Sequence, residues 1–423
     1  MALPRGVIIL PGCRKGSRRG DCRVSHSGGS QVSARQAVGV RQCSPEAADR
    51  EVRDALFAAA AELGDLSRLF AGKRKVLVKP NIGTDDVRRH RGRQVALTDP
   101  AVLRATLELI RQSYDGEIVI GEATTGSPCQ EIYDRVGHRL DDLGARVVDL
   151  KDGPFVTLPL PGGLMFDRYV MAAEYADADM IVSVAKMKSH LSTGATLCLK
   201  NLFGMTPTAP YGSPRRYLHA PVRLPRVLVD VALLHPPELC VVDGLVGQSG
   251  QEWHGEPNEP GVVLVGTNVV ATDAAAMRMM GFDPEQDFGE YPYLFDRNPI
   301  RLAAEAGLGS PAANDIDIRG DASFLCAAPF SVNRQPSDTV ARVRMDVARQ
   351  IDWYRSHRHE LCSRHQGKYL AIAGESVIAV AETVDDLGGR GALAEGASAG
   401  GILVKRADVA ECEDERLEVY DRL

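Results

Sequence analysis

The stretch from Met180 to His190 reads MIVSVAKMKSH and joins an apolar half to a charged half. The apolar residues Met180 to Ala185 are typical of a strand that is buried on both faces of a parallel sheet. In an extended chain the side chains at i, i+2 and i+4 point to one side, which would bring Lys186, Lys188 and His190 together. Like charges in a small volume repel one another and lower lysine pKa values. Folding does not require such crowding, so the stretch predicts a site for an anion or a carbonyl group.

Strands and helices alternate on both sides of this stretch. Strands are predicted over residues 75–78, 117–120, 146–150, 180–185, 239–242 and 262–265, with a hairpin over 154–172. Helices are predicted to begin at Ser44, Asp99 and Ser127 and to cover 225–234 and 268–280. Continuous apolar strands separated by amphipathic helices are typical of a parallel sheet that is covered on both faces. The pattern therefore predicts an α/β fold with a mostly parallel, Rossmann-like sheet.

The chain of 423 residues is predicted to have four parts. They are an N-terminal strand and flexible basic loop (1–43), the α/β core (44–335), a linker helix (336–362) and a small α+β accessory domain (363–423). The loop is inferred from the Arg-, Gly- and Ser-rich composition of residues 12–42. The accessory domain is inferred from two strands that a turn at 374–376 joins. A unit of about 60 residues is marginally stable alone, so we expect it to dock on the core.

Composition and charge limit the classes of partner. A hydrophobic content of 44% and a charged content of 25% are those of an ordinary globular protein. The net charge of −6 and the pI near 6.0 argue against nucleic acid or a membrane surface as a partner. The N-terminal residues fit neither a membrane span nor a secretory signal, so a cytoplasmic location is expected. Size and class are compatible with a homodimer.

The nine cysteines are scattered, and no two of them form a Cys-x-x-Cys pair. Zinc ribbons and ferredoxin-type clusters use such pairs. The sequence therefore predicts reduced, structural cysteines, and no metal site is predicted from them.

Polar residues follow several of the predicted strands. In an open α/β sheet, ligands bind beyond the carboxyl ends of the strands. The strand at 75–78 leads to Lys79 and Asn81, that at 117–120 to Glu122, and that at 239–242 to Asp243. Each of these residues alone is also explained as an ordinary loop residue. Together with the lysines and the histidine after 180–185, they favour a cleft.

A second group of candidates follows the lysine–histidine stretch. Thr193 to Thr196 supply small residues and hydroxyls at the start of a predicted helix over 197–203, where free N–H groups attract anions. Lys200 lies about one turn into that helix, and the loop over 205–219 is expected to add cations as a lid. A plain helix cap and a solvated loop are the alternatives. The predicted catalytic residues are Lys186, Lys188, His190, Lys200 and His219. The predicted substrate-binding residues are Lys79, Asn81, Glu122, Thr193, Thr196, Asn201, Arg216 and Asp243.

With these motifs the chain resembles the DUF362 family, a domain of unknown function. The resemblance covers about residues 70–310. It rests on Val78 to Asn81, Thr98 to Pro100, Gly121-Glu122, Ala185 to His190, Thr193 to Gly204, His219, Asp243-Gly244 and Ala271 to Asp273. The C-terminal 60 residues resemble a small accessory domain that also has no assigned function. The resemblance implies no single activity or cofactor. Many relatives carry cysteine-rich ferredoxin modules, whose cysteines this chain lacks.

Three hypotheses of function follow. The first is an enzyme that acts on a small anionic or carbonyl-bearing substrate by elimination, isomerisation or condensation, in a specialised biosynthetic pathway, with Lys200 or Lys188 as base or electrostatic stabiliser. The second is a metal- or iron–sulfur-associated oxidoreductase in which a partner supplies the cluster or the cleft supplies the ligands, which would be His190, His219, Glu122 and Asp243. The third is an anion-binding protein without catalysis. The crowded lysines favour the first, because simple anion binding is easily achieved with arginine.

Overall fold

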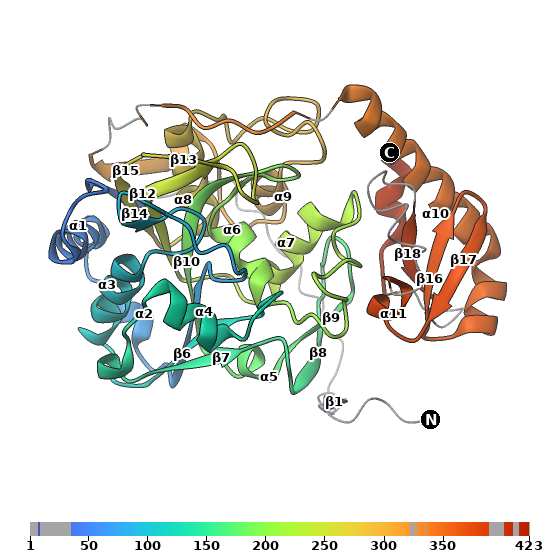
Figure 1. The fold of residues 1–423 in the computed structure, drawn as a ribbon, viewed down its shortest axis with the longest axis horizontal. Helices are drawn as coiled ribbons and strands as arrows, with labels where there is room; N and C mark the ends of the chain where they lie inside the picture. Colours follow the sequence, from blue (N-terminus) through green and yellow to red (C-terminus); the bar gives the residue numbers. More distant parts are fainter. Residues whose placement is uncertain are drawn as a thin grey trace, which may run out of the picture.

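The computed structural model describes residues 7–8, 35–321, 326, 328–334, 336–388, 402–408 and 414–422. Within them the main sheet has ten strands, and its longest path runs β15-β2-β14-β12-β10-β3-β6-β7 (Figure 1). The strands on this path are β2 (Gln36–Gln42), β3 (Lys75–Pro80), β6 (Glu117–Glu122), β7 (Ala145–Asp149), β10 (Met180–His190), β12 (Leu239–Ser249), β14 (Val262–Gly266) and β15 (Ile316–Gly320). Only β14 among them runs antiparallel to its neighbours. The predicted mostly parallel α/β fold is confirmed.

Helices cover both faces of this sheet. α1 (Asp49–Ala61), α3 (Pro100–Arg111) and α4 (Cys129–Val136) pack in one apolar core together with Val182 and Val184 of β10. α7 (Arg223–Leu234), α8 (Val269–Met280) and α9 (Pro299–Glu305) pack in a second core with Ile181 and Ala185. Successive side chains of β10 therefore enter opposite cores, as the alternation of a strand requires. This double burial explains why the strand is apolar throughout its first half.

Two of the helices begin where their sequences predict, and α8 also ends as predicted. The Asp99 side chain accepts a hydrogen bond from the N–H of Ala101 at the start of α3, and Pro100 occupies the first turn. The Asn268 side chain caps α8 in the same way, and Gly281 ends that helix in a left-handed conformation with φ of 88°.

The N-terminal prediction needs two corrections. Strand β2 lies inside the segment 12–42, which was predicted as a loop; residues 9–34 lie outside the described residues. The strand forms because Val38 and Val40 alternate into the core while Gly39 faces α1, where a Cβ atom would lie 1.9 Å from the carbonyl oxygen of Ala59. The first helix begins at Asp49 and not at Ser44, because Ser44 to Ala47 form a turn before it.

Strands β10 and β12 are longer than predicted. β11 (Gly194–Thr196) folds back on the end of β10, and β13 (Glu256–Asn258) folds back on the end of β12. The backbone groups beyond residues 185 and 242 are therefore paired in ladders. As a result Lys186, Lys188 and His190 lie within a strand, and the pairing with β12 is irregular between Lys186 and Lys188.

The C-terminal part forms a second unit beside the core, drawn in orange and red in Figure 1. Its sheet has the order β17-β16-β18 in the described residues. Its elements are α10 (Ser337–His365), β16 (Tyr369–Ala373), β17 (Ser376–Ala381), α11 (Val384–Gly388), β18 (Leu403–Arg406) and the 3₁₀ helix η4 (Leu417–Arg422). α10 buries Val347, Ile351 and Tyr354 on one face, so it is part of this unit as well as a connection to the core.

Further short elements complete the described chain. They are β1 (Val7–Ile8), α2 (Ser67–Phe70), β4 (Arg89–His90), β5 (Arg93–Gln94), β8 (Phe155–Pro159), β9 (Arg168–Ala172), α5 (Ala173–Ala176), α6 (Cys198–Asn201) and the 3₁₀ turns at 141–143, 202–205 and 313–315. β8 and β9 form the predicted hairpin. Among the described residues, no helix combines the length and apolar character that a membrane crossing requires.

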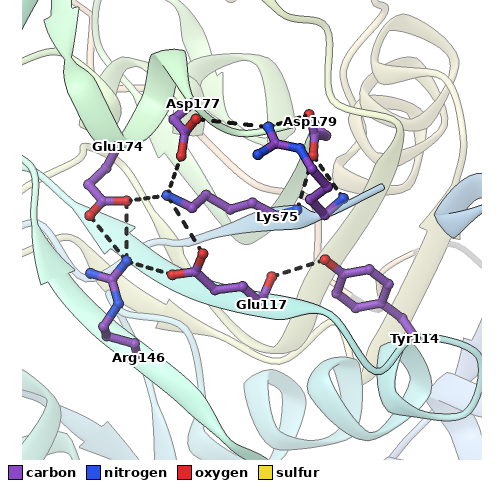
Figure 2. Close-up of polar contacts among 8 residues, drawn as sticks. Lys75, Tyr114, Glu117, Arg146, Glu174, Asp177 and Asp179 are labelled. Carbon is purple, nitrogen blue, oxygen red and sulfur yellow. Dashed lines mark hydrogen bonds and ion pairs between the residues drawn. The ribbon is translucent and has the colours of Figure 1, made fainter. Parts of the chain in front are cut away.

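Charged residues at the amino ends of the strands are paired with one another (Figure 2). The Nζ of Lys75, the first residue of β3, lies 2.7 Å from Oδ2 of Asp177 and 2.9 Å from Oε2 of Glu174. Arg146 binds Glu174 as well as Glu117, at 3.1 and 2.8 Å. Although burial alone would lower it, the pKa of Lys75 is raised by these carboxylates. These ion pairs form a structural network at the amino edge of the sheet.

His138, which follows α4, makes the protein sensitive to acid. The side chain is buried beside the ring of Tyr133, and neither ring nitrogen has a hydrogen-bond partner within the described chain. Burial lowers the pKa of His138 to about 3. The unfolded chain therefore binds a proton below the ordinary pKa of about 6.5 while the folded chain does not, so stability falls as the pH falls.

The variant His138→Phe is expected to remove this part of the acid sensitivity. Between pH 7 and about pH 5, the wild type should lose about 2 kcal/mol more unfolding free energy than the variant. Urea unfolding at both pH values measures the difference. The exposed His359, changed to Phe, is the control and should behave as the wild type. Equal pH dependence of wild type and His138→Phe would contradict the burial argument.

Candidate active site

A cavity of about 240 Å³ lies at the carboxyl ends of β3, β6 and β10. Nine of the predicted site residues line it: Lys79, Asn81, Glu122, Lys188, His190, Thr196, Lys200, Asn201 and His219. These residues come from separate strands, a short helix and a loop, so the fold brings together what the sequence separates. The position agrees with the rule for open α/β sheets.

One wall of the cavity is a buried hydrogen-bond network around Lys79. Its Nζ lies 2.6 Å from Oε2 of Glu122 and 3.1 Å from Oδ1 of Asn201. The amide of Asn201 in turn donates to the carbonyl oxygen of Lys79 and to the hydroxyl of Ser183, at 2.8 and 3.0 Å. Asn81 donates to the same Asn201 oxygen at 3.2 Å. Lys79 is thus a fixed cation, and burial lowers its pKa despite the Glu122 charge.

Gly204 allows this network to form. A Cβ atom at this position would lie 2.1 Å from Oε1 of Glu122 and 2.6 Å from Cε of Lys79. The carbonyl oxygen of Gly204 also accepts a hydrogen bond of 2.6 Å from the N–H of Ala123. Close approach to the ion pair, and not an unusual backbone angle, therefore requires glycine here.

Gly204→Ala is expected to lower the free energy of unfolding by about 1–3 kcal/mol, because the methyl group forces a buried ion pair apart. Chemical denaturation measures the loss. Gly83→Ala is a matched control, since its Cβ would lie 3.3 Å from the same Glu122 oxygen and needs only a small adjustment. Equal stability of the two variants would contradict the close packing described for Gly204.

Lys186 and Asp243 are not part of the cavity, contrary to the prediction. Both side chains are fully buried, and the Lys186 Nζ lies 2.9 Å from Oδ2 of Asp243. Asp243 also accepts the N–H of Asp99 at 2.7 Å, which ties the start of α3 to the sheet. Lys186 and Lys188 have different surroundings. Lys186 lies opposite the Asp243 carboxylate on β12, whereas Lys188 follows the irregular pairing of the two strands and lines the cavity. The pair is structural.

Lys188 and Lys200 are the lysines of the cavity without a close carboxylate. Lys188 Nζ donates to the carbonyl oxygen of Ala96 at 3.1 Å, and burial lowers its pKa to about 8. Lys200 Nζ makes neither a hydrogen bond nor an ion pair with the residues described, and lies 4.9 Å from the centre of the Phe203 ring. Burial, together with the charges of Lys188, Arg215 and Lys79, lowers the pKa of Lys200 to about 7. A large fraction of Lys200 is therefore an uncharged amine at neutral pH.

The two histidines of the cavity are neutral and have opposite hydrogen-bonding roles. Nδ1 of His190 accepts the N–H of Ser192 at 3.1 Å, which leaves the ring proton on Nε2. Nδ1 of His219 donates to the carbonyl oxygen of Arg215 at 2.9 Å, which leaves Nε2 as an acceptor. Burial lowers the pKa of His190 to about 3. His219 lies at the accessible mouth, yet surrounding protein atoms and Lys200 lower its pKa to about 4.

Glu252 is a carboxylate of the cavity that the sequence argument did not include. It accepts the N–H of Leu191 at 2.9 Å, and its Oε1 lies 3.8 Å from Nε2 of His190. Although burial raises it, the pKa of Glu252 is lowered by His190, by the Leu191 N–H and by Lys200. The neighbouring Trp253, which is 46% exposed, lines the mouth. Both residues lie in the turn between β12 and β13.

The arginine of the cavity is Arg215, whereas the predicted Arg216 is exposed and does not line it. Arg215 has a left-handed backbone with φ of 64°, which turns its side chain inward and that of the next residue outward. Its guanidinium donates to the carbonyl oxygens of Thr206 and Ala123 and lies 5.3 Å from the Phe203 ring. The sequence shows two adjacent arginines and does not indicate which of them faces the cavity.

The predicted anion site at a helix N-terminus is wrong. Thr193 to Thr196 form the β10–β11 hairpin, and helix α6 has only four residues. The N–H groups at the start of this helix, those of Cys198 and Leu199, each donate at 2.8 Å to the carboxylate of Asp273. Thr193 faces a small neighbouring cavity, and only Thr196 lines the main one. Asp273 thereby holds the short helix that carries Lys200 and Asn201.

No group of three or more His, Cys, Asp or Glu side chains is placed to hold a metal ion within the described ranges. Of the four residues considered as metal ligands, Asp243 is paired with Lys186 and Glu122 with Lys79. His190 and His219 remain in the cavity, each with one nitrogen already hydrogen-bonded. The cavity instead gathers nitrogen donors that suit an anion or a carbonyl oxygen.

Together, the fold and the cavity define an α/β domain with a cationic site at the carboxyl edge of its sheet. Residues 76–278 match the family model "Domain of unknown function (DUF362)", which confirms the resemblance for this part of the chain. A thylakoid-associated protein of Synechocystis sp. (sll1697) is 26% identical over 230 residues, which are 52% of this chain and 68% of the relative. A Thermotoga maritima protein of known crystal structure matches with a TM-score of 0.30 and 14% identity. That match covers 51% of this chain and 55% of the other, so this chain spans about half of that protein's length.

Proposed function

We propose that the cavity binds a small carbonyl compound that carries a carboxylate, and that the amine of Lys200 removes a proton from the carbon next to the carbonyl group. The state of the Lys200 Nζ supports this role. The pKa of Lys200 is about 7, and no other described group binds this nitrogen by a hydrogen bond or an ion pair. A general base acts best when its pKa lies near the working pH.

The neighbouring residues support the same chemistry. Proton removal forms an enolate, whose oxygen needs hydrogen-bond donors and positive charge. In this proposal Nε2–H of the neutral His190 and the ammonium group of Lys188 stabilise that oxygen, while Arg215 attracts the carboxylate. Lys200 keeps the abstracted proton and returns it or passes it to Nε2 of His219, which accepts. The reaction class is an isomerisation, an elimination or a condensation.

The exchange of carbon-bound protons tests this proposal. The protein is incubated in D2O with α-keto acids such as pyruvate and oxaloacetate, and proton NMR follows the loss of the signal of the hydrogens next to the carbonyl group. Wild type is expected to accelerate the exchange and Lys200→Met to abolish the acceleration. Lys368→Met, at a partly exposed ion pair in the C-terminal unit, is the control and should retain it. Acceleration that survives in Lys200→Met would contradict the role of Lys200.

The cellular setting remains part of the proposal. A cytoplasmic location, a homodimer and a role in a specialised biosynthetic pathway are predictions of the sequence, and the relative from Synechocystis carries the name of a thylakoid-associated protein. Cell fractionation and light scattering of the purified protein measure the first two.

A further inference from the structure

The C-terminal unit contacts the loop that completes the cavity. This loop, residues 206–219, supplies Pro214, Arg215 and His219 to the cavity lining. The hydroxyl of Tyr369 in β16 donates to the carbonyl oxygen of Pro210 at 2.6 Å. The loop therefore has the cavity on one side and the C-terminal unit on the other.

Two further contacts hold the middle of the loop. The N–H of Ser213 donates to Oδ1 of Asp385 in α11 at 2.7 Å. At Gly212, a Cβ atom would lie 2.7 Å from Cγ1 of Val384, so the two units approach closely at this point. These contacts lie within three residues of Arg215, whose left-handed backbone with φ of 64° is unfavourable for a residue with a side chain. Contacts from outside the loop are needed to maintain that conformation.

The end of the loop is held by a buried charged group centred on Glu415. Its carboxylate accepts from Arg223 of α7 at 2.5 and 3.0 Å, from the hydroxyl of Tyr217 at 3.2 Å, and lies 3.0 Å from Nζ of Lys405. Arg223 also donates to the carbonyl oxygens of Tyr217 and Val404. Glu415 and its two cations are fully buried, so this group fixes the loop end, the core and the C-terminal unit to one another.

We infer that the C-terminal unit is a positioning part of the cavity: through Tyr369, Asp385 and Glu415 it holds the loop 206–219 so that Arg215 and His219 face the bound ligand. The family match ends at residue 278, before this unit begins. The unit thus adds to the site although none of its described residues lines the cavity. The inference rests on the cavity and its loop, and it holds whichever reaction the cavity performs.

Two measurements on the full chain test the inference. Hydrogen exchange of the peptide that covers 206–219 reports on the loop, and trace acetylation with mass spectrometry reports on the uncharged fraction of each lysine amine. In Glu415→Gln the exchange of the loop should be at least roughly tenfold faster. Withdrawal of Arg215 should also reduce the acetylation of Lys200 at neutral pH by roughly fivefold, because a positive charge that lowers the pKa of Lys200 is removed. Lys73, which pairs with Glu238 near the amino edge of the sheet, is the internal control.

Glu382→Gln is the matched control variant, because Glu382 pairs with Lys368 in the same unit at 2.7 Å, on a partly exposed surface. It should leave both readouts unchanged. Tyr369→Phe removes a single hydroxyl group and replaces Glu415→Gln in the test if that variant does not fold. It should also accelerate the hydrogen exchange of the loop. Wild-type exchange and wild-type Lys200 acetylation in folded Glu415→Gln and Tyr369→Phe would overturn the inference. If Lys200 of the wild type is not acetylated at neutral pH, the proposed function fails, while the exchange of the loop still decides the inference.

Discussion

Lys186→Met is expected to lower the free energy of unfolding by about 3–5 kcal/mol, because it leaves the Asp243 carboxylate charged and without a cation in the core. Both side chains are fully buried, and Asp243 also accepts the N–H groups of Asp99 and Leu245. Although Lys186 lowers it, burial raises the pKa of Asp243. Removal of the lysine is expected to raise the pKa of Asp243 further, because the charge that lowers it is lost. Urea unfolding at neutral pH measures the loss.

A second substitution separates charge from packing. Lys186→Met combined with Asp243→Asn removes both charges but keeps an acceptor for only one of the two N–H groups, which donate to different oxygens of Asp243, so part of the lost stability should return. Lys368→Met, at a partly exposed pair, should cost less than about 1 kcal/mol. A loss of that small size for Lys186→Met would contradict the view that this pair is buried and structural.

Lys200→Met is expected to lower the rate of proton exchange on the substrate by roughly 10²–10⁴-fold, the usual contribution of a general base. The wild-type rate should rise with pH up to about 7, because only the uncharged amine accepts a proton and burial lowers the pKa of Lys200 to about 7. It should fall again above about pH 8, because burial lowers the pKa of Lys188 to about 8 and the ammonium group that stabilises the enolate is then lost. The measurement is the pH dependence of exchange by NMR.

Lys200→Arg distinguishes a base from a fixed positive charge. Arginine keeps the charge but cannot lose its proton at these pH values. The variant should therefore be as inactive as Lys200→Met. Activity of Lys200→Arg close to that of the wild type would show that position 200 needs only a positive charge, and would contradict the role of Lys200 as the base.

The sequence predicts the sheet well where strands are apolar on both faces. The strands that begin at Lys75, Glu117 and Met180 were found from their apolar runs, and α3 and α8 from their caps. β2 was missed because it follows an Arg-, Gly- and Ser-rich stretch and has only two core residues, Val38 and Val40. Pairing partners that lie far away in the chain, here β14 and β15, decide that it is a strand.

The candidate site was predictable where polar residues end a strand directly. Lys79 and Glu122 follow this rule. Asp243 appeared to follow it too, but β12 continues to Ser249, so this residue lies inside the sheet opposite Lys186. Glu252 and Arg215 were not predicted, because their positions depend on a turn and on a left-handed backbone that tertiary contacts stabilise.

The pH dependence of trace acetylation at Lys200 in the wild-type protein tests the central claim most directly. The amount of acetyl group at each lysine is measured by mass spectrometry across the range in which amines lose their protons. Lys368, which is partly exposed, serves as the reference. We expect a midpoint for Lys200 near pH 7, well below that of an ordinary lysine. A midpoint near 10 would mean that Lys200 stays charged in the cavity, and would contradict its role as the base.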